Sequence, residues 1–315
     1  MKKQYLIPLV LILVLGTYLL LKKDDQRNYD LPTPPAIEQS EIDRITIQGP
    51  LGHLELKREK STWLLTDDQK EFEADTRAVD KMLDTLTHLR ITALASEKQD
   101  RQRYELADDQ ALEVTAFETD NEKLRLRIGK PSPTGNHTFV MLGSDTKIYH
   151  AAKNFRSDFQ GSLDDFRNKQ VLNFQRGGLK KFLVHAWGET KAFTAVAPDK
   201  KTDQKDSVLA FKAADGSKAD AKVITDLIST LSDLTCDEFP RGLTRAELEK
   251  SDPICKITLE NGETMVLNLF GEKGLATSSM VPFPFKLQSY TAKDIQSYVE
   301  KLTGTEQAKE TDKKE

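Results

Sequence analysis

Two sixteen-residue segments of the chain resemble each other, and this repetition constrains the fold more than any other feature. They read ADTRAVDKMLDTLTHL (74–89) and ADAKVITDLISTLSDL (219–234), with five identical positions and five of conserved character. In each segment apolar residues recur at the spacing of one face of an amphipathic helix. These apolar stripes are Val79, Met82, Leu83, Leu86 and Leu89 in the first segment, and Ile224, Leu227, Ile228, Leu231 and Leu234 in the second. We therefore predict two equivalent helices, each packed on its own sheet.

Strand-like segments precede and follow both predicted helices in the same order. Alternating apolar and polar residues at 45–66 and at 181–197 indicate strands before each helix. Hairpins are predicted after each helix, at 112–129 and at 254–272, and the second has Asn-Gly at its turn. The pattern predicts an α+β fold made of two tandem copies of an antiparallel-sheet-plus-helix unit, residues 41–175 and 176–303.

The N-terminus carries a segment of seventeen residues without a charge, Tyr5 to Leu21, between two pairs of lysines. As a helix it would extend roughly 26 Å, at the short end of what spans a bilayer. A cleaved signal peptide is the alternative, but such peptides end in small residues, whereas this segment ends in leucines. We expect an uncleaved transmembrane helix within residues 1–23, an extended linker at 24–40 and a disordered tail at 304–315. The nearly equal numbers of Lys and Arg on the two sides do not fix its orientation.

Composition and motifs exclude several functional classes. The formal net charge is −4, and no basic cluster suited to a nucleic acid is present. The five histidines are scattered, and the Gly129-Lys130 pair lacks the spacing of a phosphate-binding loop. We therefore expect no catalytic residue, no metal site and no cofactor. Cys236 and Cys255 could pair, although two buried free thiols are the preferred interpretation.

Four stretches of the sequence resemble a known family. They are STWLLTDDQKEFEADTRAVDKMLDTLTHL (61–89), LRLRIGKPSPTGNHTFVML (124–142), KIYHAAKNF (147–155) and LDDFRNKQVLNF (163–174). Together they resemble the bacterial domain of unknown function 4340, over most of residues 41–303. One departure is Glu105, where that family often has glycine between tyrosine and leucine. The resemblance implies an N-terminally anchored protein outside the inner membrane, similar to those that accompany gliding-motility-type auxiliary components of ABC transporters. It brings no catalytic residues.

Three functional hypotheses follow. The first is a non-catalytic accessory protein of the cell envelope, held by Tyr5 to Leu21 in the inner (cytoplasmic) membrane as a single-pass protein with its body on the periplasmic side. Its expected partners are the lipid bilayer and permease or auxiliary subunits of an ABC-type transport or gliding-motility-like complex. The second hypothesis is an envelope glycan- or lipid-binding module, with Trp187, Phe283 and Phe285 as its aromatic lining. The third, an uncharacterised enzyme, has no legible set of catalytic residues.

Two residues are candidates for an interface, Arg167 and Trp187. Arg167 follows Asp164, Asp165 and Phe166 just before the second predicted unit. A guanidinium group can anchor a partner because its planar fork donates several hydrogen bonds. The alternative role for Arg167 is an internal salt bridge, with Asp165 or with the surface of the other unit, that fixes the angle between the units, and this is the preferred interpretation.

Overall fold

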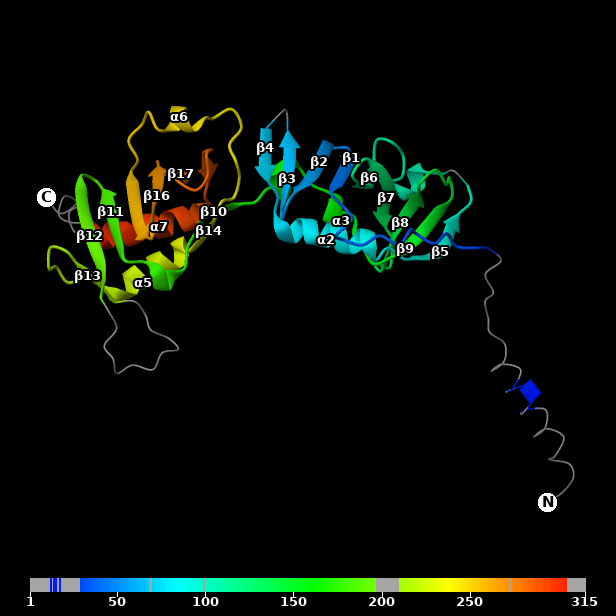
Figure 1. The fold of residues 1–315 in the computed structure, drawn as a ribbon, viewed down its shortest axis with the longest axis horizontal. Helices are drawn as coiled ribbons and strands as arrows, with labels where there is room; N and C mark the ends of the chain where they lie inside the picture. Colours follow the sequence, from blue (N-terminus) through cyan, green and yellow to red (C-terminus); the bar gives the residue numbers. More distant parts are fainter. Residues whose placement is uncertain are drawn as a thin grey trace, which may run out of the picture. The chain divides into compact units, whose positions relative to one another are not determined.

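The computed structural model describes residues 29–67, 70–98, 100–196, 210–271 and 273–304, together with residues 12, 14, 15 and 17. The chain divides into two compact units, one formed by Met1–Lys70 with Arg77–Ser162 and the other by Glu71–Thr76 with Leu163–Glu315. Largely antiparallel sheets and a few helices make up these units, so the predicted α+β class is confirmed (Figure 1). The division falls at residue 162 instead of 175, because the segment from 163 to 174 packs with later residues.

A nine-stranded sheet dominates the first part of the chain, in the order β4-β3-β2-β1-β6-β7-β8-β9-β5. Its strands are β1 (Arg44–Gly49), β2 (Gly52–Glu59), β3 (Thr62–Asp67), β4 (Lys70–Glu73), β5 (Ile91–Ser96), β6 (Leu112–Glu118), β7 (Asn121–Pro131), β8 (His137–Leu142) and β9 (Ile148–Ala152). The associated helices are α2 (Thr76–Thr87), α3 (Arg156–Phe159) and the 3₁₀ turn η2 (Gln102–Tyr104).

Helix α2 forms where its apolar stripe predicts it. The stripe residues Val79, Met82, Leu83 and Leu86 are all buried. The helix ends at Thr87, so Leu89 lies beyond it and is only partly buried. The chain needs Leu89 and the following residue to enter β5, which starts at Ile91. The predicted helix was therefore too long at its end.

The sheet has a second, smaller apolar cluster that the sequence pattern did not reveal. It consists of Leu106, Phe139, Met141 and Ile148, with Tyr104 packed edge-on to Phe139 at 4.7 Å between ring centroids. Tyr104 and Leu106 come from the connection between β5 and β6, which covers this part of the sheet. Between them, Glu105 adopts a left-handed conformation with a φ of 54°. The loop therefore keeps a left-handed residue although glycine is absent. Glu105 takes this conformation with the strain of a non-glycine residue at positive φ.

The second unit is built on a seven-stranded sheet in the order β13-β12-β11-β15-β16-β17-β18, with a separate pair β10-β14. Its strands are β10 (Gln170–Asn173), β11 (Lys181–Ala186), β12 (Glu189–Val196), β13 (Ala210–Ala213), β14 (Asp233–Thr235), β15 (Cys255–Asn261), β16 (Glu263–Phe270), β17 (Leu275–Ser278) and β18 (Phe285–Lys286). Its helices are α4 (Leu163–Phe166), α5 (Ala221–Leu231), α6 (Arg245–Leu248), α7 (Ser289–Thr303) and the 3₁₀ turn η3 (Arg176–Gly178).

Helices α5 and α7 pack against each other, and α7 lies along β11 and β12 (Figure 1). Asp220 caps α5, because its carboxylate accepts a hydrogen bond from the backbone N–H of Lys222 at 2.8 Å. The apolar face of α5 is buried, including Leu227 and Leu231. Phe182 and Phe193 stack between neighbouring strands with their ring centroids 4.6 Å apart. The core therefore lies between the two helices and the sheet.

The two sheets share a strand order. The run β3-β2-β1-β6-β7-β8-β9 corresponds, strand by strand along the chain, to β13-β12-β11-β15-β16-β17-β18. Helix α5 follows β13 directly in the sequence, whereas α2 follows β3 after the short additional strand β4. The segment after each helix then pairs with the final strand, β5 with β9 in the first case and Glu238 with Lys286 of β18 in the second.

Among the residues that the structure describes, no helix combines the length and apolar character needed to cross a membrane. The predicted anchor at residues 5–21 lies outside the described residues except at 12, 14, 15 and 17, and the predicted tail lies outside them after Gly304.

Candidate functional site

Arg167, the first residue that the sequence singles out, is buried in the second unit, with 6% of its surface exposed. Three phenylalanine rings surround its guanidinium carbon, with centroids at 3.9 Å (Phe72), 3.5 Å (Phe239) and 4.5 Å (Phe283). A cation over an aromatic face is attracted by the ring quadrupole, and more strongly when water is excluded. Nη1 also donates a hydrogen bond to Oδ1 of Asp164 at 3.2 Å.

Backbone contacts hold the two segments of this cluster together. Ala74 and Arg167 form an antiparallel β-bridge. On either side of it, the N–H of Asp75 donates to the carbonyl of Phe166 and the N–H of Asn168 donates to that of Glu73, both at 2.8 Å. The guanidinium group therefore lies where the backbone of residues 71–76 pairs with that of residues 163–168. These contacts fit the internal role considered for Arg167, with Asp164 as an ion-pair partner, and its partner-binding role stays a prediction.

Trp187, the second candidate, lies at the tip of the β11–β12 hairpin and is 42% exposed. Ala186 pairs with Glu189, so the turn consists of Trp187 and Gly188 alone. Their φ angles are 51° and 80°, as in a type I′ turn. Glycine occupies this left-handed region at low cost, and asparagine and aspartate do so less readily. For other residues the left-handed conformation costs ~1–2 kcal/mol. A large aromatic side chain is thus presented outward from an unfavourable backbone position.

The aromatic lining considered for a glycan- or lipid-binding module is not presented as expected. Phe285 is fully buried in β18, so it cannot line an open surface. Phe283 is partly buried and is packed against Arg167 and against the ring of Phe239, 5.1 Å away. The prediction for Phe285 was wrong because its strand pairs with β17, which places its side chain in the core. Trp187 remains the exposed member of that set.

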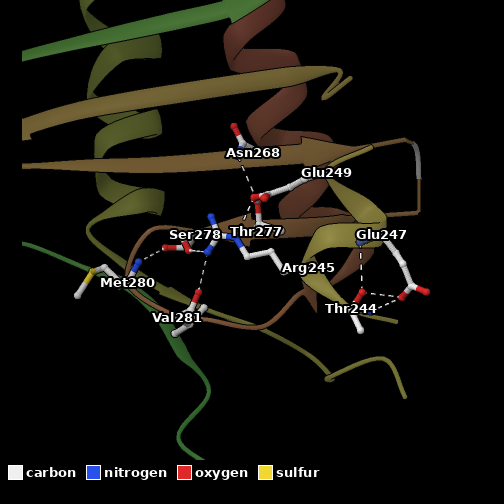
Figure 2. A network of polar contacts seen from close by, with 9 residues as sticks. All are labelled: Thr244, Arg245, Glu247, Glu249, Asn268, Thr277, Ser278, Met280 and Val281. Carbon is white, nitrogen blue, oxygen red and sulfur yellow. Dashed lines mark hydrogen bonds and ion pairs between the residues drawn. The ribbon is translucent and has the colours of Figure 1, made fainter. Parts of the chain in front are cut away.

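A polar network in the second unit fastens the β14–β15 connection to strand β17 (Figure 2). Arg245, at the start of α6, donates from Nη1 to the carbonyls of Ser278 at 2.7 Å and Val281 at 3.0 Å. Its Nε donates to Oε1 of Glu249 at 2.8 Å, and the same oxygen accepts from Oγ1 of Thr277 at 3.2 Å. Figure 2 shows the side chains of Arg245, Glu249 and Thr277 lying close together.

The start of α6 is stabilised by a capping box. Thr244 accepts a hydrogen bond from the backbone N–H of Glu247, and the Glu247 carboxylate accepts one from the backbone N–H of Thr244 at 2.8 Å. Hydrogen bonds from the Thr244 side chain and backbone lower the pKa of Glu247. Because the donors and acceptors of this network satisfy one another, we interpret it as a structural clamp.

The cysteines are free and buried, in agreement with the preferred interpretation of the sequence. Burial raises the pKa of Cys236 and of Cys255 to about 12 each. A thiol with so high a pKa is a poor nucleophile at neutral pH. Within the described part of the chain, no three His, Cys, Asp or Glu side chains are grouped so that they could hold a metal ion.

Sequence reasoning missed a cavity of about 170 Å³ in the first unit. Its lining includes Glu113 of β6, Arg125 and Arg127 of β7, Met141 of β8 and Arg101 from the β5–β6 connection. In β7 the two arginines alternate with Leu124, Leu126 and Ile128, which are buried on the other face. The alternation LRLRI in the sequence was the available signal, since it places two arginines on one face of a strand. The approach of Arg101 could not be inferred from spacing.

Comparisons with known proteins identify a family for this chain. No curated protein and no solved structure matches it. A family model described as Domain of unknown function (DUF4340) matches residues 63–253, which is more than half of the chain. The matched range contains α2, the Arg167 cluster apart from Phe283, and the Trp187 turn. The chain therefore belongs to the family Domain of unknown function (DUF4340).

Proposed function

We propose that this chain is a non-catalytic, membrane-anchored interaction protein of the cell envelope. Residues 5–21 would hold it in the inner membrane, and the folded units would lie on the periplasmic side, where they would bind subunits of an ABC-type transport or gliding-motility-like complex. The uncharged segment between two lysine pairs supports the anchor. The transporter context rests on the family resemblance alone.

We also propose that the two units are copies of one ancestral unit. The matching strand order supports this. In both units, moreover, the segment that follows the helix (α2 or α5) pairs with the last strand of the matching run. The repeated helix sequences at 74–89 and 219–234 support it independently.

The observation that carries the interaction role is Trp187. Tryptophan is enriched among the residues that dominate binding at protein interfaces. An Asn-Gly pair would suit a two-residue hairpin turn better than Trp-Gly. Trp187 therefore costs folding stability at its position while its side chain is 42% exposed. Contact with a partner would offset that cost.

In-cell photo-crosslinking tests this proposal. A photoreactive phenylalanine analogue replaces Trp187 in the full chain, and trapped partners are identified by mass spectrometry. The matched control places the same analogue at Glu263, an exposed position of the β15–β16 hairpin. Strand register puts the two turns at opposite ends of the same sheet, since Ala186 pairs with Cys255 and Lys181 with Glu260.

Permease or auxiliary subunits trapped from position 187 but not from 263 are the expected result. Equal trapping from both positions would remove Trp187 as the carrier of the interaction. Trapping of lipid or glycan alone would favour the binding-module alternative.

A further inference from the structure

The arginines that line the cavity in the first unit differ in how their charge is balanced. Arg127 forms an ion pair with Asp108, and Arg125 forms one with Glu122. In contrast, Arg101 makes no ion pair and no side-chain hydrogen bond with any residue that the structure describes. The cavity therefore has one guanidinium group whose charge the surrounding chain leaves unbalanced.

The two carboxylates that line the cavity also differ in whether their charge is balanced by a partner. Asp145 accepts hydrogen bonds from the hydroxyl of Tyr149 at 2.6 Å and from the backbone N–H of Lys147 at 2.9 Å. Glu113 lies opposite Arg127 in the β6–β7 register, but Arg127 is paired with Asp108. Within the described ranges, the Glu113 side chain has no ion pair or hydrogen bond of its own.

Two further atoms of the lining point to an acceptor group on a ligand. Nε of Arg101 and Nε of Arg127 are buried and have no hydrogen-bond acceptor among the described residues. A ligand oxygen beside these guanidinium groups would supply an acceptor that the described residues do not. Charged oxygens suit guanidinium donors best.

We propose that this cavity binds a small zwitterion, with its anionic oxygens against Arg101 and Arg127 and its ammonium group against Glu113. An anion without a positive group would also meet the repulsion of Glu113 and Asp145. The volume of about 170 Å³ is smaller than the roughly 300–1,000 Å³ of cavities that bury drug-sized ligands. The ligand is therefore small, or it is the end group of a larger molecule. An amino acid and a phosphoethanolamine headgroup share this chemistry.

Calorimetric titration of the full-length chain in detergent tests the proposal with probes that carry one or both charges. Glycine carries both charges, acetate only the negative one and methylammonium only the positive one. We expect glycine or phosphoethanolamine to bind at least tenfold more tightly than acetate and methylammonium. Tighter binding of phosphoethanolamine than of glycine would indicate a lipid headgroup as the source, and the reverse a free amino acid or peptide end.

Variants of the two unbalanced residues sharpen the test. Arg101→Gln and Glu113→Gln should each weaken binding of the zwitterion at least tenfold, whereas Lys123→Gln, at a partly exposed ion pair on the same hairpin, should not. Arg101→Lys, which keeps the charge, should retain part of the binding, and melting temperatures of all variants report whether they fold. Acetate binding as tightly as glycine, or no binding by any probe, would overturn the proposal. Neither result bears on Trp187, which belongs to the other unit.

Discussion

At the scale of single residues, Arg167 shows how much one side chain can organise. Its guanidinium group contacts phenylalanines from three separate stretches of sequence, at positions 72, 239 and 283. The spacing of these residues in the sequence gives no hint of their proximity. The sequence therefore pointed to Arg167 but could not indicate its surroundings, which depend on long-range packing.

Replacing Arg167 tests the importance of this cluster for stability. Arg167→Ala removes three cation–ring contacts and leaves Asp164 without this ion pair, and breaking a buried charged contact costs about 3 kcal/mol. We expect the free energy of unfolding, measured by urea denaturation of the full chain, to fall by that order. The control is Arg176→Ala, because Arg176 forms one exposed hydrogen bond to Ser229 and its loss should change the unfolding free energy by less than about 0.5 kcal/mol. Equal effects of the two substitutions would contradict the structural role of Arg167.

A substitution at Trp187 is expected to increase the stability of the chain. Trp187→Asn places in the left-handed position a residue that tolerates it, so the chain should become more stable by about 1 kcal/mol. Thermal unfolding measures this gain. A loss of stability would instead show that the indole ring is needed for packing.

His150 makes stability depend on pH. Burial, and next the neighbouring His137, lower the pKa of His150 from its ordinary value of 6.5. As the pH falls through about 6.5, the unfolded chain therefore binds a proton before the folded chain does, and stability decreases. We expect the free energy of unfolding to be lower at pH 5.5 than at pH 7.5, and His150→Phe to reduce this difference. A His150→Phe variant that keeps the full difference would contradict this prediction.

At the scale of elements, helices α2 and α5 were predictable because their apolar residues follow helical periodicity without a break. Hairpins with strong turn signals, such as Asn261-Gly262, were predictable for the same local reason. The β5–β6 connection was not, since its apolar residues Tyr104 and Leu106 follow no period and pack in a cluster with residues of β8 and β9 that lie far away in the sequence. The arginine-lined cavity depends on that connection, so the sequence could indicate the strand arginines but not the site.

The repeated helices allow the same destabilising substitution to be made at equivalent positions of α2 and α5. Leu86→Asp and Leu231→Asp each bury a carboxylate where a fully packed leucine had been, since the two leucines are 1% and 0% exposed. Loss of a core leucine costs ~2–5 kcal/mol, and the buried charge adds to this. Thermal unfolding should show a large loss of stability for both variants.

Two exposed positions on the same helices provide the controls. Arg77→Asp in α2 and Ser229→Asp in α5 should have small effects on the melting temperature. Wild-type melting of either leucine variant would mean that its helix does not cover a sheet.

At the scale of the whole molecule, the proposed anchor is open to a direct test. Ile12→Asp with Val14→Asp places two charges within the apolar segment, at ~2.5–3.5 kcal/mol each near the centre of a bilayer. We expect the double variant to leave the membrane fraction while both folded units stay resistant to limited proteolysis. Ile12→Leu with Val14→Leu should keep the chain in the membrane. Retention of the aspartate variant in the membrane, or a mature wild-type N-terminus near residue 24, would refute the anchor.

The assignment of residues 71–76 to the second unit has a consequence for how the chain is made on the ribosome. These residues emerge early, but Arg167 and the carbonyl of Phe166, to which they bind, are synthesised much later. At ~5–20 residues per second the delay is on the order of ten seconds. During that time Phe72 lacks its contact with Arg167. A nascent chain truncated before residue 163 would never form these contacts.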